Sequence, residues 1–238
     1  MSEDAEDSDG SSGALIQLSM DAGQFLEKLA GNSLEELDGL FGDWLRYQRL
    51  KLATGRLEGA REMCRKADID NPGEVSLSTL APWLEGASIE DNSSLHEMWE
   101  SLLANAADPR DGRRETHRSF ARILKQIEPP EQRVLKALYH IDSESGDKER
   151  GLTILGTYPD DGTIIDKIGV LAPSHDRLQL AKINLVRLGL CVRGRNSAVV
   201  PEDENPPQPQ EAPHAVHISD FGRAFYEACQ PPNPTRSC

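Results

Sequence analysis

Residues 94–127, SLHEMWESLLANAADPRDGRRETHRSFARILKQI, contain the pattern that decides the fold of this chain. In the first half, apolar side chains recur at three- and four-residue spacing, at Leu95, Met98, Trp99, Leu102, Leu103 and Ala106. This period places them on one face of a helix. Asp108 is followed by Pro109, which ends the helix because proline disfavours the helical conformation of the residue before it. A charged loop then leads to a second helix, whose predicted apolar face is Phe120, Ile123, Leu124 and Ile127.

Local signals predict how these helices begin. Ser94 and Glu97 have the spacing of a capping box, in which the serine accepts from the backbone three residues on and the glutamate reaches back. Pro129 and Pro130 predict the start of the next helix, because proline is favoured in the first helical turn. We expect the apolar faces of the two helices to share one hydrophobic core, which is a more ordinary use of tryptophan and methionine than a cofactor site.

Composition limits the possible functions. The chain has 238 residues and a net charge of −14, so the molecule as a whole repels nucleic acid and anionic membranes. The acidic N-terminus lacks the features of a signal peptide, and no apolar run is long enough to span a membrane. The four cysteines are widely spaced, as expected of reduced thiols. These features predict a cytoplasmic protein.

The expected fold class is mainly α, with an N-terminal helical domain followed by a winged-helix-like C-terminal unit that contains a small β-hairpin. Residues 1–13 carry five acidic residues and no basic one, and we expect this tail to be disordered. The helical domain is predicted over residues 14–127 and the winged-helix-like unit over 128–230. Within that unit, residues 201–213 form a Pro-rich loop that we expect to be disordered, and residues 231–238 form a loose tail.

The C-terminal pattern is the basis of the winged-helix prediction. Ser174 begins a predicted helix that runs to Leu188 and ends at Gly189, with Leu178, Ala181, Leu185 and Leu188 facing inward. Residues 191–193, 198–200 and 214–218 are predicted strands, and Ser219 caps a last helix. Helices followed by a long-looped hairpin and a closing helix are typical of a winged helix-turn-helix.

Winged helices often bind DNA, and basic side chains would then contact its phosphates. The candidate contacts are Arg177, Lys182, Arg193 and Arg195, in a segment (175–195) with five basic residues and one acidic residue. However, at 100° per residue Arg177, Lys182 and Arg187 point to three different sectors of their helix. The loop at 201–213 carries four acidic residues and no basic one, which opposes contact with phosphate. A DNA-binding transcriptional regulator is therefore the alternative hypothesis.

No motif for catalysis, a cofactor or a metal is present. There is no phosphate loop, dinucleotide fingerprint or zinc spacing. His214 and His217, three apart on a predicted strand, point to opposite faces and do not chelate one metal. We therefore expect no enzymatic activity, no cofactor and no metal site. The sequence does not predict an oligomeric state.

Three segments carry a family resemblance: RYQRLKLATGRLEGAREMCRKADID at 46–70, LSTLAPWLEGASIEDNSSLHEMWESLLANAADP at 77–109 and HRSFARILKQIEPPEQRVLKAL at 117–138. They resemble the Abi-alpha (abortive infection alpha) family, over roughly residues 34–229. The resemblance implies a bacterial protein of phage defence, with a domain of otherwise unknown function and no catalytic residues to carry over. The acidic tail and the Pro-rich insert depart from the family pattern. We expect a role in bacteriophage defence through protein–protein interaction, with an unidentified protein partner.

Overall fold

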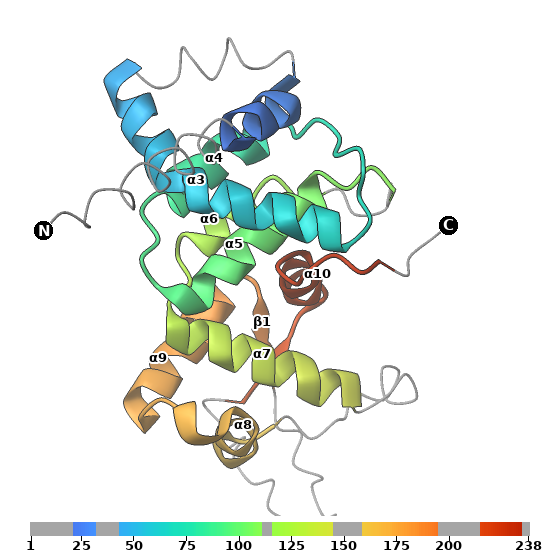
Figure 1. Ribbon diagram of the computed structural model, residues 1–238. Coiled ribbons are helices and arrows are strands. Elements are labelled where there is room, and N and C mark those ends of the chain that lie inside the picture. The colour runs from blue at the N-terminus through green and yellow to red at the C-terminus, as the bar shows by residue number, and fades with distance from the viewer. Residues whose placement is uncertain (1–20, 32–42, 111–115, 145–158, 195–214, 235–238) are drawn as a thin grey trace, which may run out of the picture. The chain divides into compact units, whose positions relative to one another are not determined.

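The computed structural model describes residues 21–31, 43–110, 116–144, 159–194 and 215–234 (Figure 1). In the helix that begins at Asp43, side chains are described from Ala53 onward. A helix at residues 21–30 comes first. The helices that follow are α3 (Asp43–Lys66), α4 (Leu77–Ala87), α5 (Ser93–Ala106), α6 (Phe120–Leu124), α7 (Pro129–Glu144), α8 (Asp161–Ile168), the 3₁₀ turn η2 (Gly169–Leu171), α9 (His175–Arg187) and α10 (Asp220–Ala228). The strands are β1 (Cys191–Arg193) and β2 (Val216–Ile218).

The chain folds into two compact units. The first consists of Met1–Gln126 and Ala228–Cys238, and the second of Ile127–Glu227. The described residues from Ala228 onward thus pack with the first unit. There the buried Asn105 of α5 donates from Nδ2 to the backbone oxygens of Ala228, at 2.9 Å, and Gln230, at 2.7 Å.

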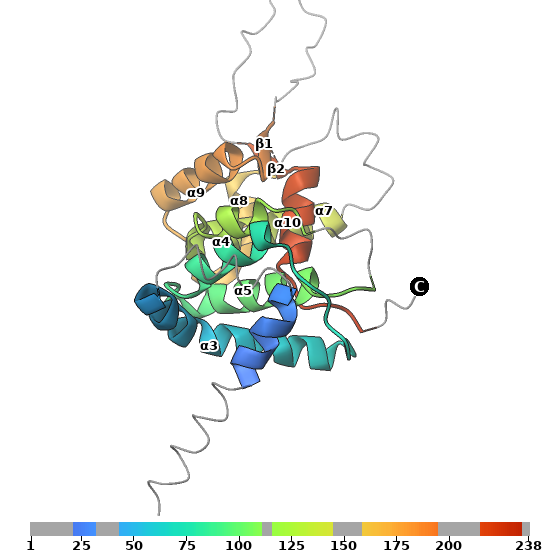
Figure 2. The same cartoon turned by 90° about the horizontal axis from the view of Figure 1, so that it is seen from above.

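Helix α5 is the centre of the first unit, with α3 alongside it (Figures 1 and 2). The predicted common core is confirmed, because its members are all buried: Leu95, Met98, Trp99, Leu102, Phe120, Ile123 and Leu124. Trp83 of α4 joins this core and donates from Nε1 to the backbone oxygen of Trp99 at 2.7 Å. The α4 backbone also approaches α5 closely, since a Cβ on Gly86 would collide with the Trp99 ring.

The predicted capping box at Ser94 is wrong. Helix α5 begins at Ser93, and its N-cap is Asn92, two residues before the predicted cap. The Asn92 side chain accepts from the backbone N–H of Ser94 at 3.0 Å and from the Ser94 hydroxyl at 2.7 Å. Asparagine and serine are nearly equal as N-caps, so the residues alone did not determine which of them would cap the start of the helix. The second predicted helix is also shorter than its apolar pattern, because α6 ends at Leu124 although Ile127 is buried.

Gly55 and Gly59 of α3 form a GxxxG motif, and one of the two glycines has a packing role. A Cβ on Gly59 would collide with the Glu100 carboxylate of α5, whereas one on Gly55 would meet no atom. Glu100 pairs there with Arg56 of α3 at 3.1 Å. Gly59 therefore lets α3 approach α5 at the point where the two helices share an ion pair.

The second unit packs α7 against α8, α9 and β2. Helix α9 ends as predicted at Gly189, whose φ of +75° is favourable for glycine. The Leu190 N–H donates to the Leu185 oxygen at 2.9 Å, and the Gly189 N–H to the Val186 oxygen at 3.0 Å. These are the two bonds of a Schellman motif.

The two strands pair antiparallel, with Cys191 opposite Ile218 and Arg193 opposite Val216. The predicted cap of α10 is confirmed, because the Ser219 hydroxyl accepts from the Gly222 N–H at 2.9 Å. Gly222 itself lies against the Leu190 carbonyl, where a Cβ would collide with backbone. The turn after α9 and the start of α10 therefore fit together through backbone groups.

The chain is thus mainly helical with a small two-stranded antiparallel sheet, as the sequence predicts. The winged-helix assignment of the second unit stays a prediction in its detail. The expectations for residues 1–13, 198–200 and 201–213 lie outside the described residues.

Candidate functional site

Of the four residues predicted to contact nucleic acid, the structure describes three, and one of these three is buried. Arg177 is exposed in the first turn of α9, and Arg193 is exposed at the end of β1. Arg195 lies outside the described residues. Lys182, the remaining candidate, is buried inside the second unit.

Lys182 is therefore not placed to contact a phosphate. Its side chain is only 2% exposed, and Nζ donates to Oδ1 of Asp161 at 2.5 Å. Asp161, in the first turn of α8, also accepts from Gln179 Nε2 at 2.5 Å and lies 3.8 Å from His175 Nδ1. Lys182 thus ties α9 to α8. The sequence held a signal for this, because at 100° per residue Lys182 lies only about 40° from the inward position Leu178 around the helix.

The opposite face of α9 is apolar at its centre and exposed to solvent. Leu180 is 65% exposed and Ile183 is 47% exposed. Asp176 and Arg187, also exposed, lie one turn to either side on the same face. These four residues, Asp176, Leu180, Ile183 and Arg187, are called the α9 stripe below. The sequence reasoning missed the stripe, although its spacing of four, three and four residues is that of a helix face.

Further apolar side chains in the same unit are exposed. Val170 and Leu171 lie in η2, the element before α9 in the chain. Val192 lies on β1, the element after α9. Arg133 of α7 holds η2 in place by donating to the Leu171 backbone oxygen at 2.9 Å. Val170, Leu171 and Val192 thus expose further apolar side chains in the segments that precede and follow α9 in the chain.

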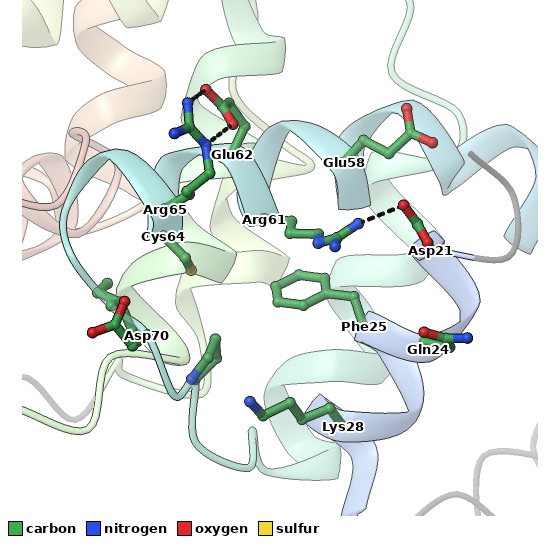
Figure 3. Close-up of a pocket in the computed structure, with 12 residues that line it drawn as sticks. Asp21, Gln24, Phe25, Lys28, Glu58, Arg61, Glu62, Cys64, Arg65 and Asp70 are labelled. Atoms are coloured by element: carbon green, nitrogen blue, oxygen red, sulfur yellow. Dashed lines mark hydrogen bonds and ion pairs between the residues drawn. The ribbon is translucent and has the colours of Figure 1, made fainter. Parts of the chain in front are cut away.

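The first unit has a hollow of about 560 Å³, shown in Figure 3. It is lined by the helix at residues 21–30, the second half of α3 and the turn at residues 69–72. Its lining contains seven charged side chains: Asp21, Lys28, Glu58, Arg61, Glu62, Arg65 and Asp70.

Several of these charges neutralise each other. Arg61 pairs with Asp21 at 3.1 Å across the hollow (Figure 3). Arg65 donates two hydrogen bonds of 2.7 Å to Glu62, and these lower the pKa of the Glu62 carboxyl to about 2. Burial raises the pKa of Glu58, with a further rise from the Asp21 charge that Arg61 opposes. The hollow therefore has a mixed lining whose cations are largely engaged by its own carboxylates.

The one thiol in the hollow is not an activated nucleophile. Burial raises the pKa of Cys64 to about 11, with a smaller rise from the Asp108 charge. The thiolate is the reactive form of cysteine, so Cys64 stays protonated and inert near neutral pH. Within the described ranges, no three His, Cys, Asp or Glu side chains are grouped so that they could hold a metal ion.

Among the helices that the structure describes, none combines the length and apolar character needed to cross a bilayer.

The sequence was also compared with known proteins. The profile of one family, described as abortive infection alpha, matches residues 48–229. That match runs from α3 to the residue after α10 and covers most of both units. Comparisons with curated proteins and with solved structures gave no match. Because the profile covers most of the chain, the protein belongs to the abortive infection alpha family.

Proposed function

We propose that the protein contributes to bacteriophage defence without an enzymatic activity of its own, by binding another protein through the exposed face of α9. The family supports the defence role. The observation that carries the binding role is the exposure of Leu180 and Ile183 at the centre of the α9 stripe. Val170 and Leu171 add apolar surface in the segment that leads into the helix.

Physical chemistry favours a protein as the ligand of this face. Removing apolar surface from water is favourable by roughly 25 cal/mol per Å², a gain that opposes the entropic cost of forming a complex. Leucine and isoleucine contribute nothing of this kind beside a phosphate backbone, where affinity comes from lysine and arginine. An apolar centre between charged ends is the usual composition of a protein–protein contact.

The alternative, a DNA-binding regulator, would use the same helix. In a winged helix-turn-helix the helix before the hairpin enters the major groove. Here Leu180 and Ile183 occupy the outward face of that helix, and Lys182 is turned inward against Asp161. Arg177 and Arg193 remain as described basic candidates. This distribution of charge favours the protein-binding hypothesis.

Two side chains that line the hollow in the first unit are unsuited to acid–base or nucleophilic catalysis, whereas the raised pKa of Glu58 does not argue against it. Glu62 is ionised through its bond to Arg65, and Cys64 keeps its proton. Catalysis of acid–base or nucleophilic type needs a group whose pKa lies near the working pH. These two shifts move the pKa values away from neutrality.

Plating bacteriophages on a host that expresses the protein tests this proposal. The native chain should reduce plaque formation for at least one phage of a panel. The double variant Leu180→Asp/Ile183→Asp should lose this protection, because two carboxylates at the centre of the stripe prevent apolar contact. The control is Ile89→Asp, which changes a large exposed apolar side chain of the first unit. Circular dichroism should show native helix content in both variants.

Two results would overturn the proposal. Native protection in a folded double variant would exclude the α9 face as the contact surface. Absence of protection by the native chain against every phage of the panel would remove the defence role.

A further inference from the structure

The charges of the α9 stripe are arranged symmetrically about its centre. Asp176 precedes Leu180 by four residues, and Arg187 follows Ile183 by four. The midpoint of the two apolar residues and the midpoint of the two charged residues fall at the same place, between Ala181 and Lys182. The stripe therefore has an apolar centre with a negative charge toward one end and a positive charge toward the other.

Such a stripe is complementary to itself when reversed. If two α9 helices pack antiparallel about this midpoint, Leu180 of one copy faces Ile183 of the other. Asp176 of each copy then faces Arg187 of its partner, so that both ends form ion pairs. This is the property of an isologous two-fold contact, in which residue i meets j and j meets i.

We propose that the α9 stripe binds the α9 stripe of a second copy of this chain, antiparallel and about a two-fold axis. This inference rests on the proposed function, since it names the partner of the same surface. A parallel pair would place Asp176 beside Asp176 and Arg187 beside Arg187. Like charges in contact disfavour that arrangement, so the charges select the antiparallel one.

The second unit holds the stripe rigidly enough to act as a binding surface. Arg187 donates from Nε to Asn184 Oδ1 at 2.9 Å, and Asn184 donates to the buried Glu131 of α7 at 3.1 Å. Near the middle of the helix, the bond of Lys182 to Asp161 anchors α9 on α8. A helix held from behind loses little conformational entropy when its outer face is covered.

Charge-reversal variants of the stripe in the full-length chain test the proposal. Their self-association is measured by sedimentation velocity over a range of concentrations. The native protein should show a reversible monomer–dimer equilibrium. Asp176→Arg and Arg187→Asp should each weaken dimerisation by about tenfold or more, because each puts like charges at both ends of the contact. An equimolar mixture of the two variants should form a heterodimer of native strength, since every end then has opposite charges. The double variant Asp176→Arg/Arg187→Asp should dimerise like the native chain.

Two further variants separate the contact from the fold. Leu180→Asp/Ile183→Asp should be monomeric at every concentration. Arg177→Asp, a charge reversal on the same helix outside the stripe, should dimerise like the native chain. Circular dichroism and the urea midpoint of each variant should show that α9 is folded.

A native chain that stays monomeric, or single reversals that dimerise normally, would overturn the inference. So would a mixture of the two single variants that fails to form a heterodimer. The plating assay distinguishes this failure from failure of the proposed function. If the protein is monomeric but Leu180 and Ile183 are still needed for protection, the stripe binds a different protein and the proposed function stands. If the dimer forms as expected but its loss leaves protection intact, the dimer stands and the proposed function falls.

Discussion

Each face of α9 carries residues of a type that is unusual for its surroundings. The inner face buries Leu178, Ala181 and Leu185 together with a lysine, Lys182, whose charge is met by Asp161. The outer face leaves Leu180 and Ile183 in water. A lysine is thus inside and two large apolar residues are outside on one helix of thirteen residues. The inner face holds the second unit together, and the outer face is the surface for which we propose a partner.

The largest expected difference between the two faces concerns their leucines. Leu185→Ala should lower the free energy of unfolding by about 2–5 kcal/mol, because Leu185 is fully buried and its loss leaves a cavity. Leu180→Ala should change it by less than about 0.5 kcal/mol, because this side chain is largely exposed. Both are the same substitution in the same helix, so helix propensity cancels. Urea titration measures both, at a concentration where the protein is monomeric. Equal effects would show that the two faces are not different in burial.

The next largest effect concerns the buried ion pair. Lys182→Ala should destabilise the protein by about 1–3 kcal/mol, because it removes a buried aliphatic stem and leaves Asp161 without its cation. Lys182→Met keeps the stem and should cost less. The double variant Lys182→Met/Asp161→Asn should be closer to native than either Lys182 single variant, since no charge is then left uncompensated. A double-mutant cycle in urea measures the coupling, and additive effects would mean that the pair is not formed.

Cys191 lies on β1, opposite Ile218 of β2. Its thiol is expected to change the free energy of unfolding by about 1 kcal/mol as the pH rises. Burial raises the pKa of its thiol to about 12, from an ordinary value near 9. Between these values the unfolded chain releases the proton and the folded chain keeps it, so stability falls as pH rises. Cys191→Ala should lessen the loss of stability between pH 8 and pH 10 by about 1 kcal/mol. Native and variant curves that fall in parallel would contradict the raised pKa.

The smallest expected effect concerns DNA. Duplex binding by the native chain should stay within the non-specific range, at a Kd of roughly 10⁻⁴–10⁻⁶ M at physiological salt. Arg177→Ala and Arg193→Ala should leave it unchanged, and so should Lys182→Met, because Lys182 is buried. A fluorescence anisotropy titration at several salt concentrations measures this. A submicromolar complex would favour the regulator instead, if the slope of log K against log salt concentration became shallower by about one unit with each lost arginine.

Local patterns in the sequence determined most of the helices and the core of the first unit. The three- and four-residue spacing from Leu95 to Leu102 is a property of the helix itself, so it predicted the buried face of α5. Gly189 and Ser219 likewise ended and began helices where expected, because caps depend on residues a few positions apart. The family also followed from the sequence alone.

Only the tertiary structure decided which charges are buried and which apolar groups are not. Lysine is mostly exposed in proteins, so composition favoured Lys182 as a surface cation. Its burial depends on Asp161, twenty-one residues earlier in the chain and on another helix. The exposure of Leu180 and Ile183 depends on which side of α9 the other helices cover, and the hollow beside Arg61 depends on how the helix at residues 21–30 meets α3. Periodicity gives the faces of a helix, but the packing of distant segments decides which face is covered.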